Sequence, residues 1–224
     1  MKRRIFFVTG TDTGVGKTVF ACLWVRHLRE QGIRLVALKP FCSGDRDDAR
    51  ALQLAMDGEP TLDEINPWHF KAPLAPLLAA RQEVRRIRLP EVVAQIRRVT
   101  RAFEITVIEG AGGLLSPLGE GFNARHLIDA NRATPIVVCP DRLGVINQAL
   151  LALAALPRRA SAVAHVVLVA QPRPDLSSRT NWRFLRETLG AARVHRLPRV
   201  NAAQIAGRAP VAPQVRRMFD ALLR

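Results

Sequence analysis

A glycine-rich segment between a short apolar run and a helical pattern places the strongest constraint on the fold. The segment Gly10–Thr18 reads GTDTGVGKT, and it follows the apolar run Ile5–Val8. The usual phosphate-binding pattern is Gly-x-x-x-x-Gly-Lys-Ser/Thr, and here the first glycine lies one position too early. The physical requirements are still met, because glycines let the backbone approach an anion and the N–H groups at a helix start bind phosphate. A strand, a phosphate loop and a helix in this order predict an α/β fold.

Short apolar runs alternate with longer helical patterns along the chain. The runs are continuous, as in strands that are buried on both faces of a parallel sheet. Strands are expected at Ile5–Val8, Leu35–Lys39, Ile105–Glu109, Ile136–Cys139 and Val163–Val169. Helices are expected at Thr18–Gln31, Leu89–Arg101, Val145–Leu156, Asn181–Leu189 and Val211–Leu223.

This alternation predicts a doubly wound, mostly parallel sheet flanked by helices, similar to P-loop NTPases, in one domain over residues 1–224. In such sheets ligands bind beyond the carboxyl ends of the strands. The loops that follow the five expected strands should therefore lie on one rim. A site for chemistry is expected there.

Charge and composition limit the possible partners. The formal net charge is +15, but the arginines are spread over many segments and the chain has no Tyr. Stacking platforms for nucleic acid interleave aromatic and basic residues, so no nucleic-acid partner is expected. No apolar run approaches the roughly 20 residues that span a membrane, and we expect a cytoplasmic protein. Cys22, Cys42 and Cys139 are widely spaced, which argues against disulfides and zinc sites.

Lysines are rare in this chain, and two of the four lie at ends of expected strands. Lys17 closes the glycine-rich segment, and Lys39 ends the second apolar run. A lysine acts near phosphate as a flexible point charge, whereas arginine is a planar fork. Lys17 is expected to reach terminal phosphates, and the Thr18 hydroxyl is a candidate ligand of Mg²⁺.

Two carboxylates are candidates for the same metal ion. Glu109 ends an expected strand and precedes a glycine-rich stretch, and a carboxylate at such a tip can hold Mg²⁺ near a nucleotide. Asp48 begins a helical pattern, so it is either the N-cap of that helix or a second metal ligand. The five histidines show no ligand spacing, and no pair of nucleophile and base is evident.

Six segments, taken in chain order, resemble the dethiobiotin synthetase family. They lie within about the first 155 residues, and their order makes the match specific although each alone is weak. The segments are Gly10–Thr18, Leu38–Gly44, Asp48–Gln53, Asn66–Pro67, Glu109–Gly113 and Leu143–Leu151.

The resemblance implies a homodimeric ligase that uses ATP and Mg²⁺. Such an enzyme closes a ureido ring on 7,8-diaminopelargonic acid with CO₂ and releases dethiobiotin, ADP and phosphate. An amine captures CO₂ as a carbamate, ATP phosphorylates the carbamate, and the second amine expels phosphate. No protein nucleophile is required, which agrees with the absence of a nucleophile–base pair.

The resemblance also assigns roles to residues of this chain. It implies that the catalytic residues are Thr13, Lys17, Lys39 and Ser43. It implies that Mg²⁺ is held by Thr18, Asp48 and Glu109. The nucleotide would be bound by Gly14, Val15, Gly16, Lys17, Thr18, Val19, Asp48, Glu109, Gly110, Ala111, Gly112, Gln171 and Pro198. The diamine substrate would be bound by Lys39, Ser43, Gly144, Val145 and Asn147, the last three across the dimer interface.

The last third of the chain departs from the family pattern. Gln171 stands where the family has Asn, and the later Ile-Pro-x-Leu segment is represented only by Leu197–Val200. Glutamine carries the same amide one methylene further out. The sequence therefore leaves the base of the nucleotide open.

Two other functions are compatible with a phosphate loop. A partition-type ATPase would use its nucleotide as a switch and bind DNA, but such proteins usually carry an early lysine in the loop, which Gly10–Val15 lacks. Another amide- or ureido-forming ATP ligase of the same superfamily is the second alternative.

Overall fold

The computed structural model describes residues 3–223, and a parallel sheet forms its centre. The six strands of this sheet have the order β10-β9-β8-β1-β5-β2, and every neighbouring pair is parallel. The strands are β1 (Arg4–Gly10), β2 (Leu35–Leu38), β5 (Ile105–Glu109), β8 (Thr134–Asp141), β9 (His165–Ala170) and β10 (Val194–Leu197). The predicted fold class, a doubly wound parallel sheet flanked by helices, is thus confirmed.

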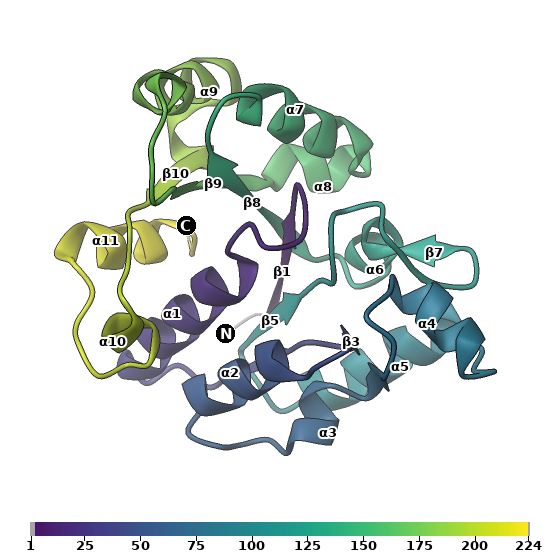
Figure 1. Ribbon diagram of the computed structural model, residues 1–224. Coiled ribbons are helices and arrows are strands. Elements are labelled where there is room, and N and C mark those ends of the chain that lie inside the picture. Colours follow the sequence, from purple (N-terminus) through teal and green to yellow (C-terminus); the bar gives the residue numbers. More distant parts are fainter. Residues whose placement is uncertain (1–2, 224) are drawn as a thin grey trace.

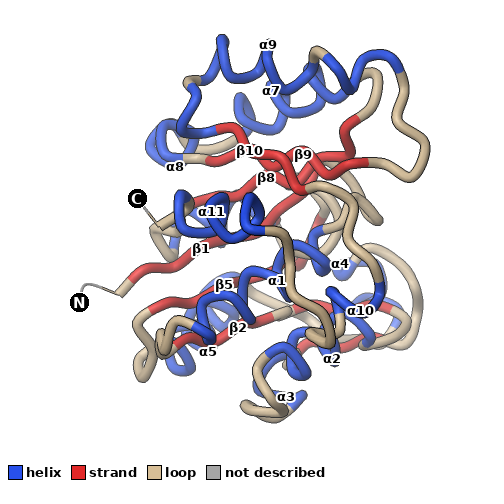
Figure 2. The backbone as a smooth tube through the Cα atoms, turned by 90° about the vertical axis from the view of Figure 1, so that its left-hand side faces the viewer, coloured by secondary structure: helices blue, strands red, loops and turns tan. Residues whose placement is uncertain are grey.

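Helices cover both faces of the sheet. Figure 1 shows α1 and α11 on one side of the central strands and α5 and α6 on the other. Figure 2 shows the strands stacked from β10 to β2, with α7 and α9 beyond the β9–β10 end. The α-helices are α1 (Lys17–Glu30), α2 (Asp47–Ala55), α3 (Leu62–Ile65), α4 (Pro76–Gln82), α5 (Leu89–Thr100), α6 (Ala124–Ala130), α7 (Val145–Ala155), α8 (Arg158–Val163), α9 (Asn181–Leu189), α10 (Ala202–Ile205) and α11 (Pro213–Ala221).

Smaller elements surround the carboxyl rim of the sheet. A parallel pair of strands, β3 (Phe41–Ser43) and β4 (Trp68–Phe70), follows β2, and an antiparallel pair, β6 (Pro117–Gly119) and β7 (Phe122–Asn123), follows β5. The 3₁₀ turns η1 (Leu176–Arg179) and η2 (Ala191–Arg193) flank α9.

No helix in the described part of the chain is long and apolar enough to span a bilayer.

Local sequence explains where the longer helices begin and end. In α5, proline occupies the first turn, where its missing N–H costs nothing, and Glu91 reaches back to the N-cap backbone. Arg97 and Arg98 lie in the last turn of α5, near the negative end of the helix dipole. Helix α11 starts at Pro213 rather than at the expected Val211, for the same reason.

The core is built from the apolar strands and the buried face of α1. Phe6 of β1 meets Trp24 of α1 edge to face at 4.9 Å, and Phe219 of α11 packs on Phe20 of α1 at 5.9 Å. All four aromatic side chains are fully buried. These contacts fix α1 against the sheet and therefore fix the glycine-rich loop that joins β1 to α1.

Strand β9 begins later than the sequence predicts, and strand β10 is not predicted at all. Val163, the first residue of the expected strand, belongs instead to α8, and its side chain is half-exposed. Strand β9 begins only at His165. Strand β10 was not expected, because its four residues include His195 and Arg196 and give no apolar run. Pairing with β9 through residues Val194 to Leu197 places it at the edge of the sheet.

Candidate nucleotide and carboxylate site

The glycine-rich loop turns at the carboxyl end of the central strand β1. Gly14 and Gly16 have φ of 72° and 97°, which is the left-handed region, and Gly16 is the N-cap of α1. A Cβ on Gly10 would lie 2.7 Å from Cγ2 of the buried Val15, so this position must lack a side chain. The backbone N–H groups at the start of α1 thus lie open at the rim, as required for phosphate.

Lys17 is buried at this helix start and is held by its own loop. Its Nζ donates to the carbonyl oxygen of Asp12 at 2.7 Å. Burial lowers the pKa of Lys17, and the nearby Lys39 ammonium lowers it further. Because the partner is a neutral carbonyl rather than a carboxylate, the ammonium retains an unbalanced charge for an anion.

Lys39, Asp48, Glu109 and Thr18 form a connected polar cluster beside the loop. The Lys39 Nζ lies 2.6 Å from Glu109 Oε1 and 2.8 Å from Asp48 Oδ2. The Thr18 hydroxyl lies 2.7 Å from Glu109 Oε1 and 2.8 Å from Asp48 Oδ1. Four residues that are far apart in the sequence thus meet around one point, and each was a predicted site residue.

The cluster is buried on one side and open on the other. Lys39 and Glu109 are almost fully buried, whereas the Asp48 side chain is about half exposed at 49%. Burial disfavours the Lys39 ammonium, but Glu109 and Asp48 outweigh it and raise the Lys39 pKa above its usual value. The Lys39 charge in turn holds the Asp48 pKa below its usual value despite partial burial. Burial raises the pKa of Glu109, and the Lys39 ammonium opposes that rise. The cluster opens to solvent at Asp48.

Asp48 is not the N-cap of α2. The N-cap position is Arg46, and Asp48 lies in the first turn with its carboxylate on Lys39 and Thr18. Of the two interpretations that the sequence left open, the N-cap is wrong. A carboxylate in the first turn still interacts favourably with the helix dipole.

The donor set suits a hard cation. Thr18 and the two carboxylates supply oxygen atoms, and Glu109 Oε2 is a buried oxygen with no hydrogen-bond partner. Mg²⁺ is usually held by one or two carboxylates together with phosphate and water rather than by a full protein cage. Among residues 3–223, no group of three or more Asp, Glu, His or Cys side chains forms a separate metal cage. Thr18, Asp48 and Glu109 thus fit a nucleotide-associated Mg²⁺.

A second glycine-rich loop, Gly110–Gly113, packs against the first. A Cβ on Gly110 would lie 2.9 Å from Cε1 of Phe7, and one on Gly113 would lie 3.4 Å from the Thr11 carbonyl oxygen. The Gly110 carbonyl accepts from Lys39 at 3.2 Å. The predicted residues Ala111 and Gly112 lie between these contacts, so this stretch forms a wall of the site.

Two hydroxyl groups lie at the predicted positions. Thr13 is exposed in the phosphate loop, and its Oγ1 is 3.8 Å from the position of a Cβ on Gly112. Ser43 ends β3, and its buried Oγ has no partner in the described chain. A buried hydroxyl without a partner is costly unless a ligand satisfies it.

The loops after β9 and β10 lie beside the phosphate loop. Val169 is 3.4 Å from the position of a Cβ on Gly16, and the Val169–Leu197 register brings Gln171 and Pro198 to neighbouring strand ends. The Gln171 side-chain amide donates to the backbone carbonyl of Val169, two residues earlier, at 2.8 Å. Gln171 and Pro198, which are predicted to bind the nucleotide, therefore lie on the same rim as the phosphate loop.

The predicted residues Gly144, Val145 and Asn147 lie at the start of α7, after β8. Gly144 is the N-cap with φ of 90°, and the Leu143 N–H donates to Asp175 Oδ2 at 2.8 Å. Within residues 3–223, the hydrogen bonds of the Lys39 ammonium go to Asp48, Glu109 and Gly110 and not to this turn. The structure thus places the turn on the same rim without bringing it into the cluster.

Sequence reasoning missed the residues that position Lys39. Asn66 donates to the Lys39 carbonyl at 2.8 Å, and Arg46 donates to the Asn66 side-chain oxygen at 3.0 Å. Arg46 also donates to the Leu62 carbonyl at 3.0 Å. Asn66–Pro67 is one of the segments that resemble the family, but nothing in the sequence predicts the contact of Asn66 with Lys39.

The cysteines take no part in the site chemistry. All three are free and buried, and burial raises the pKa of Cys22 and Cys139 to about 12 and of Cys42 to about 11. The thiols therefore remain protonated at neutral pH.

Comparisons with known proteins show the family of this chain. A family model described as an AAA domain matches residues 4–218. The ATP-dependent dethiobiotin synthetase BioD of Anaeromyxobacter dehalogenans is 44% identical over 169 residues, which are 74% of this chain and 76% of that protein. This chain belongs to the dethiobiotin synthetase family. The dethiobiotin synthetase BioD of Bacillus licheniformis is 34% identical over 204 residues, which are 88% of this chain and 87% of that protein.

A solved structure resembles this dethiobiotin synthetase family member in fold alone. A plasmid partition protein of Borrelia burgdorferi B31, bound to AMPPNP, aligns with a TM-score of 0.60 over 100% of this chain and 97% of that chain. The identity is 9%, so the likeness concerns the fold and not the reaction.

Proposed function

We propose that this chain is an ATP-dependent dethiobiotin synthetase that acts in biotin biosynthesis. It would join 7,8-diaminononanoate and CO₂ into the ureido ring of dethiobiotin, with ATP converted to ADP and phosphate. The observation that carries the proposal is the Lys39 cluster beside the phosphate loop, in a chain of this family.

The reaction needs three steps, and the two later steps build negative charge between the substrate and the γ-phosphate. One amine forms a C–N bond to CO₂ and loses a proton, which gives a carbamate. A carbamate oxygen then attacks the γ-phosphorus, and the bond to ADP breaks. The second amine attacks the carbamate carbon, loses a proton and expels phosphate, which closes the ring.

Lys39 and Lys17 are placed to stabilise the two sides of the transfer. Within residues 3–223 the Lys17 ammonium donates to the Asp12 carbonyl, a contact that a terminal phosphate would replace. Lys39 lies with Asp48 and Glu109 in the polar cluster beside the loop, and the carbamate would lie next to its ammonium. Positive charge fixed beforehand in a buried site stabilises developing negative charge strongly.

The remaining polar groups complete the site. The unpartnered Ser43 hydroxyl and the exposed Thr13 hydroxyl would donate to carbamate or phosphate oxygens. Thr18, Asp48 and Glu109 would hold Mg²⁺, which neutralises triphosphate charge when bound. When Asp48 and Glu109 hold Mg²⁺, the Lys39 ammonium would be able to donate to the carbamate instead of to them.

The exposed apolar side chains around α7 support the proposal that the chain forms a homodimer. Leu143 and Leu151 are 79% and 61% exposed, at the turn and on the helix predicted to bind the substrate carboxylate. A second copy that covers them would bring Gly144, Val145 and Asn147 to its partner's site. The buried, reduced thiols agree with a cytoplasmic location.

The test is a reconstitution with the purified protein. 7,8-Diaminononanoate, bicarbonate and Mg²⁺ are incubated with each of the four nucleoside triphosphates, and dethiobiotin is detected by mass. Product with ATP supports the proposal, and the ranking of nucleotides shows whether Gln171 alters base preference. Absence of dethiobiotin with all four nucleotides contradicts it.

A matched pair of variants links the reaction to the phosphate loop. Lys17→Ala removes the buried ammonium and is expected to weaken ATP binding and to lower turnover by about 10²-fold or more. Lys71→Ala removes an exposed lysine and should leave both unchanged. Equal activity of the Lys17 variant rejects the assignment of the loop.

A further inference from the structure

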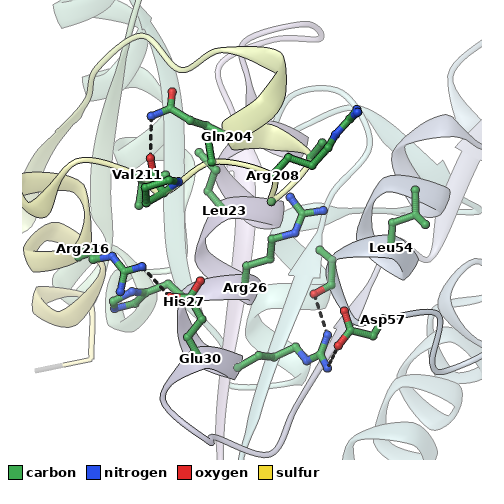
Figure 3. Close-up of a pocket in the computed structure, with 16 residues that line it drawn as sticks. Leu23, Arg26, His27, Glu30, Leu54, Asp57, Gln204, Arg208, Val211 and Arg216 are labelled. Carbon is green, nitrogen blue, oxygen red and sulfur yellow. Dashed lines mark hydrogen bonds and ion pairs between the residues drawn. The ribbon is translucent and has the colours of Figure 1, made fainter.

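A cavity of about 590 Å³ lies away from the predicted nucleotide and substrate residues. Its walls are the last two turns of α1, the end of α2, the segment from Gln204 to Val211 and Arg216 of α11. Figure 3 shows Arg26 reaching from α1 toward the segment that carries Arg208. None of the lining residues belongs to the phosphate loop, the Lys39 cluster or the Gly110–Gly113 loop.

The wall opposite α1 is held in place by hydrogen bonds. The Gln204 side chain donates to the Pro210 carbonyl at 3.1 Å, and the Arg208 N–H donates to the Ala203 carbonyl at 2.7 Å. Arg26 donates to the Ile205 carbonyl, and its guanidinium lies directly against Gly207. The cavity is therefore bounded by an ordered loop.

The charge of the cavity is positive after its internal ion pairs are counted. Arg216 pairs with Glu30 at 2.8 Å, and Arg29 pairs with Asp57. Arg26 and Arg208 also line the cavity, and neither forms an ion pair with a carboxylate among residues 3–223. Two guanidinium groups on opposite walls are thus left for an anion, and guanidinium groups bind carboxylate and phosphate through paired N–H donors.

The cavity also has apolar surface. Leu23, Leu54 and Val211 line the cavity, and the Leu54 side chain is 68% exposed. An inorganic anion would leave these side chains uncovered, whereas a short hydrocarbon chain would cover them. A ligand with one anionic head and an apolar chain matches both parts of the lining.

We propose that this cavity binds a small aliphatic carboxylate, with the carboxylate between Arg26 and Arg208 and the chain against Leu23, Leu54 and Val211. The site is separate from the nucleotide site. The proposal does not depend on the reaction that the chain catalyses.

The test measures binding of sodium octanoate to the full chain by calorimetry. We expect a Kd below about 1 mM. Arg208→Gln, at an exposed side chain, should weaken binding at least about tenfold. Arg217→Gln is the matched control, since Arg217 is exposed on α11 and does not line the cavity. Thermal unfolding of both variants checks that the fold is kept.

Two further arms separate this site from other anion sites. Saturating AMPPNP with Mg²⁺ should leave octanoate binding unchanged, and inorganic phosphate alone should bind much more weakly than octanoate. The proposal is overturned by absence of octanoate binding, by equal binding to the Arg208 variant, by displacement with AMPPNP, or by phosphate binding as tightly as octanoate.

Discussion

Lys39 is held by more polar contacts than any other predicted catalytic residue, and those contacts define its chemistry. Its ammonium lies between Glu109 and Asp48 and also donates to the Gly110 carbonyl. Its backbone carbonyl is held by Asn66. If Mg²⁺ occupies the two carboxylates, the contacts with Gly110 and Asn66 would still hold Lys39 where negative charge develops.

Lys39→Ala is expected to lower turnover by at least about 10²–10³-fold, because the charge opposite the carbamate is lost. ATP affinity should change little, since Lys17 and the loop backbone remain. Steady-state rates and nucleotide titration measure the two effects separately. A variant that still closes the ring at a comparable rate would remove Lys39 from the mechanism.

Gly110 tests the packing of the second glycine-rich loop on strand β1. Gly110→Ala places a Cβ 2.9 Å from the buried Phe7 ring, so the free energy of unfolding should fall by about 1–3 kcal/mol. Gly113→Ala is the control, because its nearest atom would be at 3.4 Å. Denaturant unfolding of both variants gives the difference, and equal stability would contradict the close packing.

Sequence reasoning reached most of the cluster residues but not the contacts that hold them. Lys17, Lys39 and Glu109 were predicted from their places at strand ends, which the parallel sheet brings to one rim. Asp48 remained ambiguous, because a carboxylate at a helix start has two uses that the local sequence does not distinguish. The contact between Asn66 and Lys39 joins distant positions, and no pattern encodes it.

At the scale of elements, the strands β9 and β10 share a pair of buried histidines. His165 Nδ1 lies 3.1 Å from His195 Nε2. Burial lowers the pKa of both to about 4, and arginine charges nearby add to the effect. Both rings are therefore neutral at pH 7 in the folded protein.

This pair predicts acid sensitivity of the β9–β10 edge. Between pH 6.5 and 4 the unfolded chain binds more protons than the folded one, so the free energy of unfolding falls as pH falls. Partial exposure of His165 reduces the effect, and we expect a loss of about 1–2 kcal/mol between pH 6.5 and 5.

Urea unfolding across this pH range measures the effect. His195→Gln should flatten the pH dependence, whereas His126→Gln, at an exposed ring, should leave it unchanged. An equal slope in the His195 variant and the unaltered chain would show that the pair is not its source.

The long elements could be predicted from sequence and the short ones could not. Helix α9 begins and ends at the predicted residues Asn181 and Leu189, because a periodic pattern runs between clear breaks. Strand β10 gives no such signal, since Arg196 is exposed and His195 finds its partner only on β9. Pairing across the sheet decides this strand, which is why local propensity misses it.

At the scale of the molecule, Leu143 and Leu151 expose apolar surface around α7. Leu151→Glu places a charge on the exposed side of α7, where we propose that a second copy packs. Light scattering should give about twice the chain mass of 24.8 kDa for the unaltered protein and about one chain mass for the variant.

Leu78→Glu on α4 is the matched control, because Leu78 is also exposed but lies on another helix. It should remain dimeric. A monomeric unaltered protein, or a dimer that tolerates Leu151→Glu, would contradict the interface at α7.

The order of the strands determines when the chain can fold during synthesis. Strand β1 lies in the middle of the sheet, yet it is made before the other five strands of that sheet. Its partners are β5, whose Ile105 lies opposite Arg4, and β8, whose Thr134 lies opposite Phe6. At about 5–20 residues per second, this apolar strand waits about 6–26 s for its second partner. Until then Phe6, Phe7 and Val8 lack one of their two neighbouring strands, so we expect chaperones to bind this apolar segment of the nascent chain.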